Sequence, residues 1–110
     1  MNELNEYQVA AERTMRIVKG GEAGQFAIWG LGLCGEAGEV AELLKKYLGH
    51  GHPLDVELMK KELGDVLWYV AALSRLCGFT LQDVAVANVA KLKARYPDGF
   101  THKRSLERSE

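Results

Sequence analysis

The most informative part of the sequence is GEAGEVAELLKKYLG at residues 35–49, followed by KELGDVLWYVAALSRLCG at residues 61–78. In both stretches apolar side chains recur at spacings of three and four residues, which is the pattern of an amphipathic helix. The glycines and proline of GHGHP, residues 49–53, end the first helix and make a loop. The two stretches therefore predict two helices with a short connection. The second is apolar over most of its surface, so we expect it to be central.

Helical spacing extends to both sides of this pair, and no stretch alternates with the period of two that is typical of a strand. Because short loops join the helical stretches, we expect an all-α fold, a compact antiparallel bundle of four main helices. The 110 residues suffice for one domain, placed at residues 1–100, with a polar, frayed tail at residues 101–110. The predicted helices cover residues 4–19, 33–48, 55–77 and 81–96, and an irregular segment from residue 25 through residues 29–32 precedes the second.

Composition and charge exclude several classes of protein. The 14 Lys and Arg against 15 Asp and Glu leave a net charge of −1, without the basic excess of a protein that binds a nucleic-acid polymer. No apolar run approaches the roughly 20 residues that span a bilayer, and the N-terminus lacks a secretion signal. We therefore expect a cytoplasmic protein without a membrane partner. Cys34 and Cys77 are too few for a disulfide framework, and we expect reduced, buried thiols.

Four carboxylates occupy unusual positions on the two central helices. At about 100° per residue, Glu36 lies inside the apolar stripe of its helix and Glu39 lies at the edge of that stripe. Glu62 and Asp65 repeat this arrangement on the next helix. Burying carboxylates together is costly unless a cation lies among them. Four oxygen donors without His or Cys suit a hard ion, so the pattern predicts a site for Mg²⁺ or Mn²⁺.

The last predicted helix carries polar side chains on its apolar side. Asn88, Lys91 and Arg95 lie there, where they would either neutralise the carboxylates directly or hold a polyphosphate. Trp29 is a core residue by default, but its position just before the acidic helix also makes it a candidate for stacking on a base. The glycines of residues 30–38 are not a phosphate loop, because no G-K-[ST] follows them. We expect these glycines to allow close approach of helices.

These motifs resemble those of a known family. GEAGEVAELLKK and KELGDVLWYVAAL are similar to the E-x-x-E and E-x-x-D halves of the signature of MazG-like nucleoside triphosphate pyrophosphohydrolases. NVAKLKARYPDGF, residues 88–100, resembles the last helix of that family, and the likeness runs from NEYQ to DGF. The resemblance implies an all-α fold, a homodimer or homotetramer, and dependence on Mg²⁺, with Mn²⁺ as a substitute. It also implies hydrolysis of a nucleoside triphosphate to the monophosphate and pyrophosphate, as in housecleaning of the nucleotide pool.

The resemblance implies roles for individual residues as well. The metal ligands and catalytic acids would be Glu36, Glu39, Glu62 and Asp65. The residues that contact the phosphates would be Lys91 and Arg95, with Asn88 beside them and Lys46 assisting from the acidic helix. Some relatives carry an additional acid immediately before the first motif glutamate, where this chain has Gly35. The general base therefore stays open between Glu36 and Glu39.

Several alternatives remain at this point. A dUTP- or dCTP-specific enzyme, or a phosphoribosyl-ATP pyrophosphohydrolase of the same superfamily, would share the metal chemistry. A di-iron carboxylate bundle needs Glu-x-x-His on two helices, and is discounted because acids stand three residues after Glu36 and Glu62. A non-catalytic helical oligomerisation module would pair its inward acids with Lys91 and Arg95 in a structural network. Self-association is expected in either case, because four short helices cannot cover the apolar surface of residues 55–77.

Overall fold

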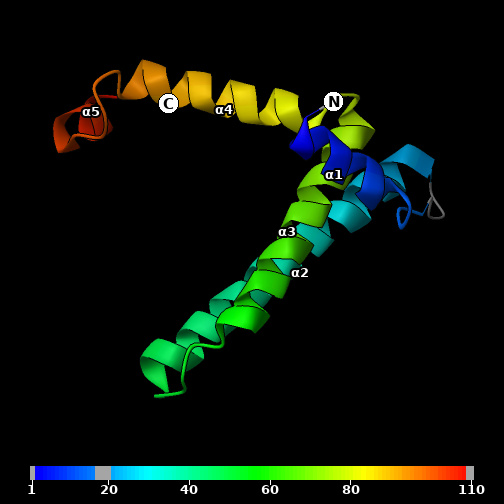
Figure 1. Cartoon of the computed structure of the whole chain (residues 1–110), viewed down its shortest axis with the longest axis horizontal. Coiled ribbons are helices and arrows are strands. Elements are labelled where there is room, and N and C mark those ends of the chain that lie inside the picture. The colour runs from blue at the N-terminus through cyan, green and yellow to red at the C-terminus, as the bar shows by residue number, and fades with distance from the viewer. Residues whose placement is uncertain (1, 17–20, 109–110) are drawn as a thin grey trace.

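The computed structural model describes residues 2–16 and 21–108, and within these ranges the chain is all-α, as predicted. The elements are α1 (Glu3–Glu12), α2 (Gly21–Gly49), α3 (Val56–Cys77), α4 (Leu81–Arg95) and α5 (His102–Glu107). Figure 1 shows α2 and α3 side by side as a long hairpin, with α1 against one end of it. From that end α4 leads away from the hairpin and carries the short α5 (Figure 1).

The α2–α3 hairpin is defined by the capped ends of α3 and by an aromatic contact between its two helices. Asp55 caps α3, since its side chain accepts a hydrogen bond from the backbone N–H of Leu58 at 3.0 Å. Gly78 ends α3 at φ 90°, a left-handed conformation that glycine adopts without steric cost. Between these ends, Trp29 of α2 meets Trp68 of α3 edge-on, with ring centroids 5.8 Å apart. The hairpin is the frame on which the acidic side chains lie.

A small core joins α1, α3 and the start of α4. Its buried members are Ala11, Ala71 and Leu81, and partly buried Tyr7, Met15, Trp68 and Val70 pack around them. Just beyond α1, the indole N–H of Trp68 donates to the hydroxyl oxygen of Thr14 at 2.8 Å. α1 therefore fastens the end of the hairpin to the corner from which α4 departs.

The prediction of a compact bundle is wrong for a single chain. The radius of gyration is 17.0 Å, whereas a compact domain of this length has about 13 Å. α3 and α4 meet at a bend of 100°, so α4 does not fold back along the hairpin. The chain exposes 8108 Å², against about 6100 Å² for a monomeric protein of this size. The apolar side chains left exposed include Leu31, Tyr47 and Leu48 on α2, Leu58, Leu63 and Leu67 on α3, and Val86, Val89 and Leu92 on α4.

Three helix boundaries differ from the predicted ones. α2 runs without interruption through residues 29–32, where an irregular segment was expected, because contacts such as that between Trp29 and Trp68 outweigh the low helix propensity of glycine. α1 ends at Glu12, earlier than the predicted end at residue 19. Residues 17–19 of the predicted helix lie outside the described residues. In the tail, Thr101 caps α5 through the N–H of Arg104, so residues 102–107 are helical and not frayed.

Two further expectations concern the thiols and the membrane. Cys34 and Cys77 are free thiols as expected, but both are exposed, since within the described ranges nothing covers the helix faces on which they lie. Over the described ranges, no individual helix combines the length and apolarity of a membrane span; α3 and α4 reach both only together, across their 100° bend.

At Gly32 the backbone of α2 lies against the ring of Tyr69 of α3. A Cβ atom at this position would collide with the ring of Tyr69, which itself packs edge-on against Trp68 at 5.0 Å. Close helix approach was the expected use of these glycines, and at Gly32 it is confirmed. Gly32→Ala should therefore destabilise the fold by about 1–3 kcal/mol, as overpacked cores do, and urea unfolding at fixed protein concentration measures the change.

Gly30→Ala is the matched control for that substitution. A Cβ at Gly30 meets nothing within 4 Å, so alanine there should be neutral or should add up to about 1 kcal/mol through its higher helix propensity. Equal unfolding midpoints for the two variants would contradict the assignment of Gly32 as the contact point.

Candidate metal centre

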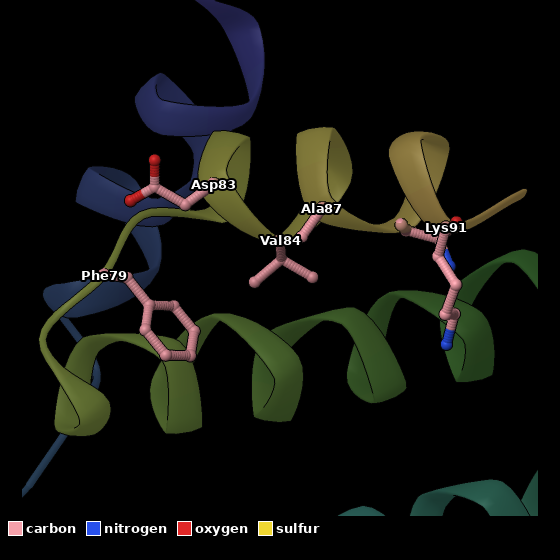
Figure 2. Close-up of a pocket in the computed structure, with 6 residues that line it drawn as sticks. Phe79, Asp83, Val84, Ala87 and Lys91 are labelled. Carbon is pink, nitrogen blue, oxygen red and sulfur yellow. The ribbon is translucent and has the colours of Figure 1, made fainter. Parts of the chain in front are cut away.

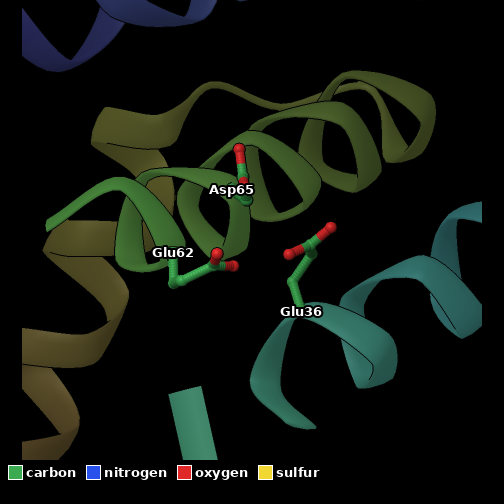
Figure 3. A group of neighbouring side chains, drawn as sticks. All are labelled: Glu36, Glu62 and Asp65. Carbon is green, nitrogen blue, oxygen red and sulfur yellow. The ribbon is translucent and has the colours of Figure 1, made fainter. Parts of the chain in front are cut away.

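Three carboxylates converge where α2 and α3 face each other. Figure 3 shows Glu36 of α2 pointing toward Glu62 and Asp65 of α3. One carboxylate oxygen from each residue lies within 4.8 Å of the other two. Glu36 and Glu62 are half-buried and Asp65 is exposed. We call these three residues the acidic triad. The sequence pattern had predicted their convergence from the apolar stripes of the two helices.

The triad concentrates negative charge. Partial burial, followed by the charges of Asp65 and Glu62, raises the pKa of Glu36 above its ordinary value. Within the described part of the chain, the ion pairs are Lys60 with Glu57 and Arg75 with Glu12, and neither involves the triad. The structural network with Lys91 and Arg95 is therefore not formed within one chain. Neutralising the repulsion among the three carboxylates therefore requires a positive charge that these ion pairs do not supply.

Oxygen ligands of this kind suit a hard divalent cation. A set of three carboxylates without sulfur or imidazole matches Mg²⁺ or Mn²⁺ better than Zn²⁺ or Cu⁺. The raised pKa of Glu36 is what an acidic cluster shows when no cation balances it. By both criteria the triad fits the ion that the sequence predicted.

The fourth predicted acid, Glu39, lies outside the triad. It is exposed one turn further along α2, although its charge still contributes to the raised pKa of Glu36.

Another residue near the site was missed by the sequence analysis. Burial and the charge of Asp65 raise the pKa of Tyr7, which reaches the neighbourhood of Asp65 from α1. Helical periodicity places Tyr7 on the apolar side of the helix predicted at residues 4–19. Periodicity of this kind gives no information about which residues of other helices are its neighbours.

The predicted phosphate-contacting residues occupy a different part of the chain. Asn88 and Lys91 line a groove of about 560 Å³ in the corner between α3 and α4, together with Phe79, Asp83, Val84 and Ala87. In Figure 2, Val84 and Lys91 point from α4 toward the side on which α3 lies. Arg95 is half-buried, and its Nε has no hydrogen-bond partner. Lys46 is exposed near the end of α2.

Trp29 is a core residue in this structure, with 8% of its surface exposed. It lies two helical turns before Glu36 on the same face of α2, and beside it are cavities of about 370 and 290 Å³ that Met15 and Leu76 also line. The structure thus brings the three acids together, but it does not bring Trp29 or the residues of α4 into contact with them within one chain.

The raised pKa of Glu36 leads to a pH prediction. The folded chain keeps the proton of Glu36 up to a higher pH than the unfolded chain does. Below the ordinary pKa the carboxyl group is protonated in both states, and the repulsion within the triad is absent. As pH rises through the raised pKa, Glu36 becomes charged and the repulsion lowers the free energy of unfolding. Metal-free Glu36→Gln should therefore melt above the wild type at neutral pH, and this advantage should disappear as pH falls through the raised value. Melting curves across that range measure the effect.

Glu57→Gln is the control for the pH series. Glu57 is an exposed carboxylate of α3 that pairs with Lys60 at 3.3 Å, outside the triad. An equal gain in melting temperature from Glu57→Gln, or a gain at Glu36 that does not vary with pH, would rule out repulsion within the triad.

Comparisons with known proteins identify relatives of the chain. Residues 29–100 match the family model described as the MazG nucleotide pyrophosphohydrolase domain, a range that includes the triad and α4. The chain is also similar to the "Gene 37 protein" of Mycobacterium phage L5, with 36% identity across 84% of this chain and 88% of the phage protein. The name of that relative states no activity. No solved structure matches the chain significantly.

Proposed function

The chain belongs to the MazG nucleotide pyrophosphohydrolase domain family, and on that basis we propose that it hydrolyses a nucleoside triphosphate to the monophosphate and pyrophosphate with Mg²⁺ as cofactor. The observation that carries this proposal is the convergence of Glu36, Glu62 and Asp65 within 4.8 Å, with no ion pair to a positive charge among residues 2–16 and 21–108. The divalent cation that accompanies a nucleoside triphosphate would supply the missing positive charge and would thereby hold the nucleotide at the triad.

The proposed roles divide between the hairpin and α4. Glu36, Glu62 and Asp65 hold Mg²⁺, for which Mn²⁺ substitutes, through carboxylate oxygens. A bound divalent cation supplies charge that stabilises the transferring phosphoryl group and makes water easier to deprotonate. Lys91 and Arg95 contact the phosphates, Arg95 through its planar fork and Lys91 as a point charge, with Asn88 beside them and Lys46 assisting.

The reaction is an in-line displacement at the α-phosphorus. The oxygen of water forms a bond to that phosphorus, while the bond from phosphorus to the bridging oxygen breaks and pyrophosphate leaves. Glu36 or Glu39 accepts the proton of the water, and the cations of α4 stabilise the charge that develops on the leaving group. Gly35 supplies no acid before Glu36, and we therefore assign the role of proton acceptor to one of these two carboxylates.

The site is proposed to be completed by a second copy of the chain, in a homodimer or homotetramer. Lys91 and Arg95 form no ion pair with the triad of their own chain, and α2, α3 and α4 all expose apolar side chains. The chain exposes about 2000 Å² more than a monomer of its size, which is the order of area that stable interfaces bury. Sedimentation velocity tests this proposal, and a monomer at micromolar concentration would contradict it.

A panel of nucleotides tests the proposed activity. Purified protein is incubated with canonical and modified nucleoside triphosphates, dUTP, dCTP and phosphoribosyl-ATP, with Mg²⁺ or EDTA, and the products are separated by chromatography. We expect monophosphate and pyrophosphate that disappear with EDTA. The fastest substrate separates a housecleaning enzyme from a dUTP- or dCTP-specific one. No turnover across the panel would favour a helical oligomerisation module.

A further inference from the structure

The corner between α3 and α4 is held by one buried side chain of α1. The amide of Gln8 is 5% exposed and donates hydrogen bonds from Nε2 to the carbonyl oxygens of Ala71 and Phe79, each at 3.3 Å. Its Oε1 accepts a hydrogen bond from the backbone N–H of Leu81 at 3.0 Å. A single amide therefore contacts α3, the corner and the first residue of α4.

Asn5 adds a second contact from the same face of α1. It lies three residues before Gln8, and its Oδ1 accepts a hydrogen bond from the backbone N–H of Gln82 at 3.1 Å. In Figure 1 the start of α4 lies next to α1. We call Asn5 and Gln8 together the amide clamp.

The clamp completes the hydrogen bonding of the first turn of α4. The first N–H groups of a helix have no partner within the helix. Here Thr80 and Asp83 satisfy each other's backbone N–H in a capping box. The N–H groups of Leu81 and Gln82 lie between them and donate to Gln8 and Asn5 of α1. Moving α4 to another direction would leave buried donors and acceptors unpaired, so α1 ties the direction of α4 to that of α3.

We propose that Gln8 is a positioning residue for substrate binding, because it fixes the direction in which α4 presents Asn88 and Lys91. The inference rests on the proposed function, in which α4 contacts the phosphates. Gln8 belongs neither to the triad nor to the lining of the groove, and it contacts that lining through the backbone carbonyl of Phe79. It also lies before residues 29–100, the range that matches the family model.

The test compares Gln8→Met, which preserves the length of the side chain and removes its hydrogen bonds, with the wild type at a temperature where both are fully helical. We expect KM for the best nucleoside triphosphate to rise about tenfold, which corresponds to ~1.4 kcal/mol of lost binding. The Mg²⁺-induced shift in melting temperature should stay unchanged, because the triad lies on α2 and α3. Amide hydrogen exchange at Leu81 should become faster. Glu6→Gln, an exposed position of α1, is the control.

A pair of variants at Asn5 keeps the inference testable if Gln8→Met does not fold. Asn5→Asp retains the acceptor for Gln82 and should keep the wild-type KM, whereas Asn5→Leu should raise it. An unchanged KM in folded Gln8→Met, or equal KM values for the two Asn5 variants, would overturn the positioning role. A wild type that turns over no nucleotide would instead overturn the proposed function, so the two failures are distinguishable.

Discussion

Glu62→Gln is expected to keep the helical fold and to lose about 10³-fold or more of Mg²⁺-dependent turnover. Glutamine retains the size of the side chain but carries no charge, and it is a poor ligand for a hard cation. Electrostatic stabilisation of a transferring phosphoryl group is worth several kcal/mol, and each ~1.4 kcal/mol is a factor of ten in rate. Circular dichroism checks the fold, and product formation under saturating nucleotide measures the loss.

Two comparisons make this result specific to the triad. Glu57→Gln removes an exposed carboxylate from the same helix and should leave turnover unchanged. Glu39→Gln should lose turnover as well but should keep more of the Mg²⁺ response, because Glu39 lies outside the triad. Turnover at the wild-type rate in purified Glu62→Gln would remove the assignment of the metal ligands.

Mg²⁺ should raise the melting temperature of the wild type substantially. A ligand at 100 times its dissociation constant stabilises the folded state by about 2.7 kcal/mol, which corresponds to roughly 10 °C for a domain of this size. Here the gain includes relief of the repulsion that raises the pKa of Glu36. Differential scanning calorimetry with Mg²⁺ and with EDTA, at one protein concentration, measures the shift.

The same measurement separates the enzyme from a structural module. Glu36→Gln, which breaks the triad, should respond to Mg²⁺ much less than the wild type does. A self-neutralised network of acids with Lys91 and Arg95 would not respond to Mg²⁺ at all. An equal shift in the wild type and in Glu36→Gln would place the bound ion elsewhere on the chain.

The features that could be predicted from the sequence are those that local periodicity encodes. The helical stretches and the all-α class follow from apolar spacing. The sequence places Glu36 and Glu62 inside the apolar stripes and Asp65 at the edge of one, and the structure confirms that these three acids converge. Glu39 lies at the edge of its stripe as Asp65 does, yet the structure leaves it outside, so the edge position alone does not predict which acid joins the triad.

The features that could not be predicted depend on contacts between distant residues. α2 continues through residues 29–32 because Trp29 packs on Trp68 and Gly32 admits Tyr69, and no local propensity contains those contacts. The direction of α4 follows from hydrogen bonds between α1 and a corner that is distant in sequence. The bond from Gln8 to Ala71, for example, joins residues that are 63 positions apart. The exposed apolar faces follow from that direction, and they are why the compact bundle was the wrong prediction for one chain.

The central claim, hydrolysis at the α-phosphorus in a site built on the acidic triad, is tested most directly by running the reaction in ¹⁸O-labelled water with Mg²⁺ and analysing the products by mass spectrometry. We predict one labelled oxygen in the nucleoside monophosphate and none in the pyrophosphate, with both products lost in Glu62→Gln. Nucleoside diphosphate with orthophosphate, or label in the pyrophosphate, would contradict the claim.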